Sequence, residues 1–261
     1  MVDSARRALH LSTGKGHMAR HSLVFWIVLL GALAASPARA INGGAPASSE
    51  LAAQTVMIVS TRGAICTGTV IARDLVLTAA HCVAPKSDYA VAIKGGAPRV
   101  IQVARIVLHP KYNPQQFETR IPSPDMAILK LAEPLPMSYR AARLMSDPAL
   151  PKRGTLFTLA GFGFARDGDE RSLGTLRSIS LPSVGTTGGI MVRVSNGNGG
   201  VAGACTGDSG GPAYLDGELA GVIGWTSIPA GKNCGFTTGV TLVGLQREWI
   251  DGTIRSLGGR S

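Results

Sequence analysis

The sequence has 261 residues, of which 45% are hydrophobic and 16% are charged, and this balance argues against a globally disordered chain. Glycine (34 residues) and proline (15 residues) are frequent, which is typical of many short strands joined by tight turns. The formal net charge is +10, but the basic residues are scattered without interleaved aromatic residues. The charge therefore favours solubility over nucleic-acid binding.

Residues 1–40 have the composition of an export signal that is later removed. A basic segment precedes an apolar run over residues 23–35, which has the length of a signal-peptide core and is too short to span a bilayer comfortably. We expect the protein to be secreted, into the extracellular space or a periplasm, and to keep no stable membrane anchor after the signal is removed.

The end of this segment predicts where the signal is cut. Ala38 and Ala40 are small residues at the positions that a signal peptidase recognises, so cleavage is expected before Ile41, with a competing site at residues 32–34. We expect translation to begin at Met18, because the chain from there to the cut has the proportions of an ordinary signal peptide.

Beyond the signal, short apolar runs alternate with turn residues, and each run has the length of a strand rather than a helix. The predicted strands cover residues 55–60, 68–71, 75–78, 89–93, 100–108, 126–131, 155–159, 176–181, 190–194, 212–215, 219–224 and 238–243. A stretch rich in proline and basic residues at 133–153 divides them, which predicts β domains at 41–150 and 151–261. Apolar residues at helical spacing over 245–257 predict a C-terminal helix.

The four cysteines predict disulfides, because disulfides persist in the oxidising compartments to which an exported chain is sent. More than one connectivity is possible. Pairing Cys66 with Cys82 and Cys205 with Cys234 is the most economical, since each bond closes a short loop around a segment with catalytic features. The sequence contains no C-x-x-C or H-x-x-H spacing, so we expect neither a metal site nor a cofactor.

Beyond residue 40 the chain has two histidines, so a mechanism that needs an imidazole base must use one of them. His81 follows an apolar strand and is adjacent to Cys82. His109 lies in a polar, turn-like run before Pro110, and we interpret it as a solvated or structural loop residue. His81 is therefore the candidate general base.

Ser209 lies in the run Gly-Asp-Ser-Gly-Gly-Pro at residues 207–212. A serine flanked by glycines can occupy a tight turn with its hydroxyl exposed and its neighbouring backbone N–H groups free, as an oxyanion hole requires. The run also fits the nucleophile elbow of α/β-hydrolases, which precedes a helix and a later histidine. Here Pro212 and a strand-like run follow, and no histidine lies beyond Ser209, so chain order excludes that class.

The order that remains is histidine, aspartate, serine. The subtilisin order, with an aspartate shortly before the histidine, is disfavoured. The only acidic residue shortly before His81 is Asp74, which lies in an apparent turn. Asp125 directly precedes an apolar strand, where a carboxylate can be buried against the imidazole of His81 and hold its tautomer. Asp125 is therefore the candidate orienting group.

Three runs resemble the signatures of the trypsin/chymotrypsin family of serine proteases, in that family's order and approximate spacing. They are Thr-Ala-Ala-His-Cys at 78–82, Asp-Met-Ala-Ile-Leu at 125–129 and the serine run at 207–212. The run Ile-Asn-Gly-Gly at 41–44 resembles the family's mature N-terminus, and Gly-Phe-Gly at 161–163 and Gly-Trp at 224–225 resemble further landmarks. We expect a secreted, bacterial-type member. The resemblance implies an all-β fold of two six-stranded antiparallel barrels with the active site between them.

The resemblance further implies a serine endopeptidase that cleaves protein or peptide substrates through an acyl-enzyme. The implied triad consists of His81, Asp125 and Ser209. The N–H groups of Gly207 and Ser209 would form the oxyanion hole, and Asp208 would pair with the α-amine of Ile41. Since Ile41 directly follows the expected cut, secretion itself would create the active form without a zymogen. A monomer is expected, with protein protease inhibitors as possible partners.

The resemblance also indicates which residues bind the substrate side chain before the scissile bond. These are Gly203, Ala204, Thr206, Gly224, Trp225 and Thr226. Gly203 and Ala204 leave the pocket base without the aspartate of a trypsin, so a bound lysine or arginine would be an unpaired buried cation. Thr226 stands where many members have glycine and would narrow the pocket mouth. We expect a preference for small or medium apolar residues.

Gly224 departs from the family pattern, which usually has a serine there whose hydroxyl supports the triad aspartate. We therefore expect a less constrained Asp125 and reduced activity. The alternative function is a secreted binding protein built on a catalytically weak or inactive protease scaffold. An intact triad argues against this alternative, because a binding protein has no need of all three groups.

Overall fold

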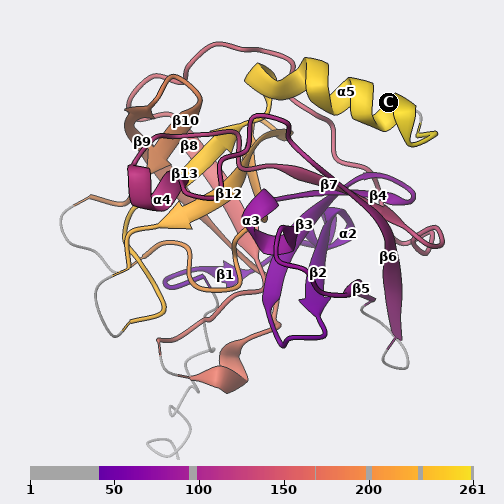
Figure 1. The fold of residues 1–261 in the computed structure, drawn as a ribbon. Helices are drawn as coiled ribbons and strands as arrows, with labels where there is room; N and C mark the ends of the chain where they lie inside the picture. The colour runs from indigo at the N-terminus through magenta and orange to yellow at the C-terminus, as the bar shows by residue number, and fades with distance from the viewer. Residues whose placement is uncertain (1–40, 94–98, 168, 198–201, 229–231, 260–261) are drawn as a thin grey trace, which may run out of the picture. The chain divides into compact units, whose positions relative to one another are not determined.

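The computed structural model describes residues 41–93, 99–167, 169–197, 202–228 and 232–259. The predicted export signal, with Met18 and the residues before the expected cut, lies outside these ranges. In the part that is described, strands dominate and helices are short (Figure 1). No helix in these ranges is both long and apolar enough to cross a membrane.

The first half of the described chain forms a closed antiparallel barrel. Its strands are β2 (Thr55–Ser60), β3 (Ile65–Ala72), β4 (Leu75–Thr78), β5 (Tyr89–Ile93), β6 (Arg99–Leu108) and β7 (Ala127–Leu131). They pair in the order β2-β3-β4-β7-β6-β5, and β5 returns to β2. Because the ring closes, no strand edge is left unpaired along it. Apolar side chains such as Val56, Leu77 and Leu129 fill the interior and are fully buried.

The second half forms another closed barrel. Its strands are β8 (Leu156–Gly161), β9 (Arg177–Thr187), β10 (Met191–Val194), β11 (Pro212–Leu215), β12 (Glu218–Thr226) and β13 (Thr238–Leu242). The ring runs β8-β9-β10-β13-β12-β11 and returns to β8, and the short β1 (Ala45–Pro46) adds to β9. The predicted fold class, two six-stranded antiparallel barrels, is confirmed.

Every strand that the sequence predicts is present, and the ends differ by a few residues in most cases. The largest difference is β9, which was expected to end at residue 181 and runs to Thr187. Its later residues pair with β10, with a bulge beside Val194, while its earlier residues pair with β8. Tertiary pairing therefore extends this strand beyond its apolar run.

The predicted C-terminal helix is α5 (Arg247–Ser256), which follows the single turn η2 (Gly244–Gln246). Its buried residues Ile250 and Ile254, with Leu257 beyond its end, belong to the same core cluster as Leu77 of the first barrel. Lys130 of β7 donates to the carbonyl oxygen of Leu257 at 3.1 Å. The helix therefore starts from the second barrel and packs against the first.

Four short turns of helix were not predicted, because a run of three to six residues is too short to show a helical period. They are α2 (Ser49–Gln54), α3 (Ala80–Val83), α4 (Gln116–Thr119) and η1 (Glu170–Ser172). In α2, the side chain of Ser48 caps the helix by accepting the N–H of Leu51 at 3.2 Å. α3 directly follows β4 and carries His81, so this one turn determines where the imidazole lies.

Candidate active site

The strand pairing of the first barrel places His81 next to Asp125. β4 and β7 are antiparallel neighbours in which Thr78 lies opposite Ala127. The end of β4 and the start of β7 therefore meet at one end of the barrel. His81 follows β4 by three residues and Asp125 precedes β7 by two, so both side chains emerge at that end.

Two hydrogen bonds join these residues. Asp125 is fully buried, and its Oδ2 lies 2.6 Å from His81 Nδ1, while its Oδ1 accepts the backbone N–H of His81 at 2.9 Å. Because a carboxylate can only accept, the proton of the neutral ring lies on Nδ1 and the lone pair lies on Nε2. The ring is thus held in the tautomer that a general base requires.

The turn that carries Ser209 is attached to the first barrel through β3. The N–H of Thr67 donates to the carbonyl oxygen of Ser209 at 2.8 Å, and its hydroxyl donates to that of Gly207 at 2.8 Å. Gly210 follows with φ of +81°, and a Cβ there would lie 2.0 Å from Thr78 Oγ1. A glycine is therefore required next to the serine, because the turn packs directly against the strands that lead to His81.

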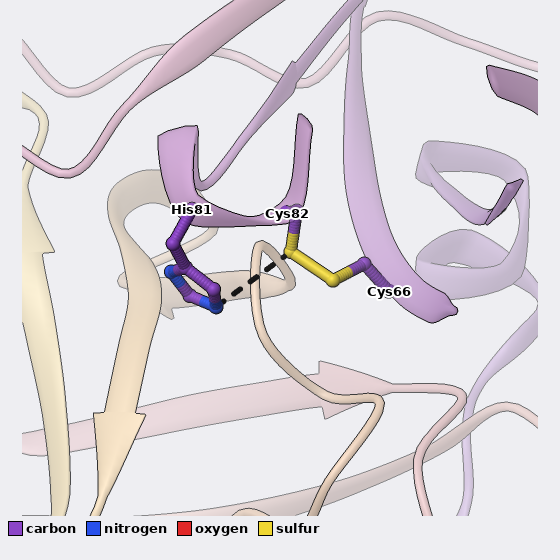
Figure 2. Close-up of side chains that lie close together, drawn as sticks. All are labelled: Cys66, His81 and Cys82. Atoms are coloured by element: carbon purple, nitrogen blue, oxygen red, sulfur yellow. Dashed lines mark hydrogen bonds between the residues drawn. A yellow bond between two sulfur atoms is a disulfide. The ribbon is translucent and has the colours of Figure 1, made fainter. Parts of the chain in front are cut away.

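The sulfur of Cys82 contacts both Ser209 and His81. It lies 3.6 Å from the carbonyl oxygen of Ser209 and 3.8 Å from His81 Nε2, the nitrogen that faces the disulfide in Figure 2. Ser209 Oγ forms no hydrogen bond with the described residues, His81 included. Catalytic hydrogen bonds are often long in a free enzyme and shorten when substrate binds.

The backbone around Ser209 leaves two N–H groups available. The carbonyl oxygen of Thr206 accepts the N–H of Phe164 at 3.1 Å, and the carbonyl oxygen of Asp208 accepts that of Gly211 at 2.9 Å. In a planar trans peptide the N–H group points opposite to the carbonyl group of the residue before it. The N–H groups of Gly207 and Ser209 therefore point away from Phe164 and Gly211. Within the described chain neither has an acceptor. These are the two predicted oxyanion donors.

Asp208 is a fully buried carboxyl group held by backbone donors. The N–H groups of Gly163 and Cys205 donate to its two oxygens, each at 2.8 Å. Burial raises the pKa of Asp208 to about 7, against the opposing effect of these two hydrogen bonds. A Cβ on Gly161 or Gly163 would come within 3 Å of the carboxyl group. The Gly-Phe-Gly run thus makes room for Asp208.

Ile41, the residue predicted to pair with Asp208, is fully buried in the core of the second barrel. Its φ is +44°, a region that a β-branched residue rarely occupies. Among the described residues, no lysine or arginine forms an ion pair with Asp208. In the continuous chain, therefore, the buried carboxyl group lacks a cationic side chain.

The residues predicted to bind substrate fall into two groups. Gly203, Ala204 and Gly224 are buried, while Thr206 is exposed and Trp225 and Thr226 are partly exposed. A Cβ on Gly203 would lie 2.4 Å from the carbonyl oxygen of Gly235, so no larger residue fits there without a shift. The hydroxyl of Thr226 donates to the carbonyl oxygen of Thr237 at 3.1 Å.

Beside His81 lies an apolar pocket of which the sequence analysis named only Trp225 as substrate-binding. Its cavity of about 320 Å³ is lined by Gln116, Phe117, Arg120, Pro122, Thr187, Met191 and Trp225. The ring of Phe117 meets the imidazole of His81 edge to face, with 5.9 Å between ring centres. The only local signal was a phenylalanine in an otherwise polar loop, which does not show what the ring contacts.

His109 is correctly predicted as structural, but it is not solvated. It is 5% exposed, its Nδ1 accepts the N–H of Lys111 at 3.1 Å, and its ring packs against Trp249 with 4.6 Å between centres. Burial, and then the charge of Lys111, lower its pKa, partly offset by a hydrogen bond between the ring and the Gln246 side chain. Because its sequence neighbours are polar, the sequence did not indicate that His109 packs against α5.

Both predicted disulfides are present, Cys66–Cys82 and Cys205–Cys234. The first joins β3 to α3 directly behind His81. The second closes the segment that leads to Ser209, where Cys205 and Cys234 also form an isolated antiparallel bridge.

Comparisons with known proteins agree with this geometry. A family model described as Trypsin matches residues 41–250. Serine protease 1 of the dog is 27% identical over 175 residues, which cover 61% of this chain and 69% of that protein. Mouse Kallikrein-8 is 30% identical over 185 residues, covering 64% and 69%. These relatives are animal proteins, so the expectation of a bacterial-type member is not borne out.

Two solved structures show the same fold. Neuropsin, a serine protease expressed in the limbic system of mouse brain, has 25% sequence identity and a TM-score of 0.67, covering 82% of this chain and all of that one. Human heparin binding protein has 23% identity and a TM-score of 0.69, covering 85% of this chain and all of that one.

Proposed function

The chain belongs to the trypsin family, and from this premise we propose that it is a secreted serine endopeptidase with His81, Asp125 and Ser209 as its triad. The observation that carries the proposal is the pair of hydrogen bonds from His81 to the fully buried Asp125. A buried carboxylate in this position orients the imidazole and stabilises the imidazolium that forms during reaction.

Acylation begins when Ser209 Oγ attacks the scissile carbonyl carbon and its proton moves to His81 Nε2. The carbonyl oxygen becomes an oxyanion, which the N–H groups of Gly207 and Ser209 stabilise. The tetrahedral intermediate then collapses as Nε2 gives the proton to the leaving amine. This leaves an acyl-enzyme on Ser209.

Deacylation repeats these steps with water as the nucleophile. His81 Nε2 takes a proton from water, the new oxyanion uses the same two donors, and the proton returns to Ser209 Oγ. Asp125 stays ionised throughout and holds Nδ1–H.

The activation step that we propose is a cut before Ile41. The cut creates an α-amine that can pair with Asp208 and remove the cost of burying an unpaired carboxylate. It also removes the preceding carbonyl group, whose position defines the φ of +44° at Ile41, so the backbone strain there disappears. If signal removal makes this cut, secretion yields the active form directly.

The specificity that we propose is for small or medium apolar side chains before the scissile bond. Gly203 and Ala204 provide no charge for a lysine or arginine side chain, and an unpaired buried cation would be costly. Thr226, partly exposed, adds bulk at the position proposed for the pocket mouth.

A fluorophosphonate probe tests the function, because it reacts with a serine only when a base has activated it. We expect labelling of Ser209 in the natural protein and none in Ser209→Ala or His81→Ala. His109→Ala is the matched histidine control and should still be labelled. Absence of labelling in a folded natural protein would contradict the proposal.

The same experiment decides the second candidate function, a protease-scaffold binding protein without activity. Gly224 favours the binding protein, because glycine offers no hydroxyl to Asp125. A Cβ built on Gly224 would lie 3.6 Å from Asp125 Oδ2. A binding protein would stay unlabelled in every variant.

A further inference from the structure

The apolar cavity beside His81 has one wall from each barrel. The first wall comes from the segment between β6 and β7, which contains α4, and the second from β9, β10 and β12 (Figure 1). The two walls touch, since a Cβ on Gly188, in the turn between β9 and β10, would lie 2.7 Å from Pro122 Cγ. The cavity therefore lies where the two barrels meet, next to the imidazole that Phe117 contacts.

The cavity borders the residues that we propose to bind the substrate. Trp225 lines it and directly follows Gly224 in the chain. Met191 also lines it, and its Cε would lie 3.6 Å from a Cβ built on Gly224. Since Trp225 belongs to the cavity and to the proposed site for the residue before the scissile bond, a substrate side chain slightly further towards the N-terminus is placed to enter the cavity.

The lining combines apolar surface with a single charge. Among the described residues that line the cavity, Arg120 is the only charged one. The aromatic and aliphatic surface comes from Phe117, Pro122, Met191 and Trp225. A ligand that fits this lining has an apolar stem and a negatively charged end.

Arg120 has no oppositely charged partner in the described ranges. Its side chain is exposed and takes part in none of the ion pairs found there. Glu118 of α4 is exposed, does not line the cavity and does not pair with Arg120. The guanidinium group is therefore available to an anionic group of a ligand in the cavity.

The backbone of Arg120 is in an unusual conformation. It ends α4 with φ of +57° and ψ of 23°, in the left-handed region. Glycine is common where a helix ends in this way, because a side chain is strained there. An arginine in place of glycine at this point, with its side chain on the cavity, indicates a use for the guanidinium group.

Gln116 adds an unpaired donor to the same lining. The residue is 6% exposed, and its Oε1 accepts the N–H and the hydroxyl of Ser123, each at 3.1 Å, which fixes the orientation of the amide. Its Nε2 has no acceptor among the described residues. A buried donor without a partner is costly, so an acceptor oxygen that entered the cavity would stabilise it.

We propose that this cavity binds the side chain of a glutamate that lies two to four residues before the scissile bond. Its methylene groups pack against Phe117 and Trp225, and its carboxylate pairs with Arg120. The substrate class is then a peptide with an acidic residue shortly before a small or medium apolar one. The cleavage preference rests on the proposed function, whereas binding of an acidic peptide does not require an active triad.

Pairs of peptides that differ only in glutamate or glutamine, at the second, third or fourth residue before the scissile bond, test the preference. The ratio of their kcat/KM values removes effects common to both peptides. At one of these positions and at low salt, the glutamate peptide is expected to be cleaved about two- to fivefold faster, the scale of an ion pair with an exposed side chain. In about 1 M salt, where charges are screened within about 3 Å, the ratio should approach one. A ratio of one at all three positions at low salt would overturn the proposal.

Variants of one arginine test the origin of the preference. Arg120→Gln should bring the ratio close to one, and Arg120→Glu should invert it and favour a lysine peptide over the glutamate peptide. Arg105→Gln is the matched control, because Arg105 is an exposed arginine of β6 that does not line the cavity, and it should keep the ratio of the natural protein. An unchanged ratio in Arg120→Gln, or an equal loss in Arg105→Gln, would refute the role given to Arg120.

Peptide binding separates this proposal from the proposed function. In a chain that begins at Ile41, Ser209→Ala/Trp249→Phe leaves Trp225 as the only tryptophan. Titration with the glutamate peptide should change the fluorescence of Trp225, with a dissociation constant about two- to fivefold lower than for the glutamine peptide. Ser209→Ala alone, with Trp249 as a constant background, gives the same comparison if the double variant is unstable.

The two assays together distinguish the possible failures. If the natural protein cleaves neither peptide while the Ser209→Ala variant binds the glutamate peptide more tightly, the protease is refuted and the acidic pocket stands. If both peptides are cleaved equally fast and bound equally tightly, the protease stands and the acidic pocket is refuted.

Discussion

Gly224 faces Asp125, the aspartate of the proposed triad, and a Cβ placed on Gly224 would lie 3.6 Å from Asp125 Oδ2. The nearest other atoms, from Met191 and Gly239, lie at 3.6 and 3.7 Å, so the space accepts a small side chain without a clash. Asp125 already receives the two donors of His81. A hydroxyl at this position would give its carboxylate a third donor.

Gly224→Ser is therefore expected to raise kcat/KM by up to about tenfold, since a hydrogen bond to a charged group contributes about 1.5 kcal/mol. Gly224→Ala fills the same space without a donor and should give no gain. Kinetics on a peptide ester with both variants checks this. An equal change in the two variants would show that filling the space, and not the hydrogen bond, is responsible.

Asp125→Asn should lower kcat by about four orders of magnitude, the scale seen when this group of a trypsin-type triad becomes an amide. The amide can donate to Nδ1, so the ring proton moves to Nε2 and the lone pair is lost. A rate that recovers as pH rises, measured with the same ester, would support the tautomer explanation. A loss of less than tenfold would contradict the role given to Asp125.

The pH dependence of the free energy of unfolding should differ between a chain that keeps residues 38–40 and one that begins at Ile41. With Asp208 at a pKa of about 7, against an ordinary value near 4, the native continuous chain binds more protons than the unfolded chain between these pH values. Its free energy of unfolding should therefore fall as pH rises from about 4 to 7. In the other form the paired amine should remove this fall, because it keeps Asp208 ionised over the whole of this range.

Urea unfolding of both forms across this range measures the difference. His109 is common to both chains, so its own titration cancels in the comparison. Asp208→Asn in the continuous chain should remove the fall in stability attributed to this carboxyl group. Identical pH profiles of the two chains would count against pairing of Asp208 with the new amine.

Gly203→Asp, the change that would make the pocket base resemble a trypsin, should not simply confer cleavage after arginine. A Cβ at this position would lie 2.4 Å from the carbonyl oxygen of Gly235, so the variant is overpacked and should lose about 1–3 kcal/mol of stability. Gly252→Ala, in α5, is the control and should be neutral or stabilising, because a Cβ there would meet only the flexible end of Arg255, at 3.9 Å. Thermal unfolding of both variants measures this, and an unchanged Tm in Gly203→Asp would be the contrary result.

The natural protein should prefer substrates with alanine, valine or leucine before the scissile bond. It should hydrolyse them at least about tenfold faster than substrates with lysine or arginine, because an unpaired buried cation costs more than about 1.4 kcal/mol. A set of peptides that differ only at this residue gives the ratio of kcat/KM values. Preferred cleavage after arginine would show that a group outside Gly203 and Ala204 supplies the charge.

The sequence alone was enough to predict twelve strands, the terminal helix, both disulfides and three candidate catalytic residues. Strand periodicity is local, since alternate side chains face the barrel interior, and it appears wherever a strand occurs. The choice of candidate catalytic residues followed from chain order and from short runs such as the one around Ser209. These features depend on neighbours in the sequence, and they can be recognised without a fold.

The tertiary structure decided the features that depend on distant residues. Burial sets the pKa of Asp208, and the packing of Gly235 against Gly203 leaves no room for a larger residue at the proposed pocket base. Burial and close contact are properties of the packed chain, because they require atoms that the sequence separates to share one small volume.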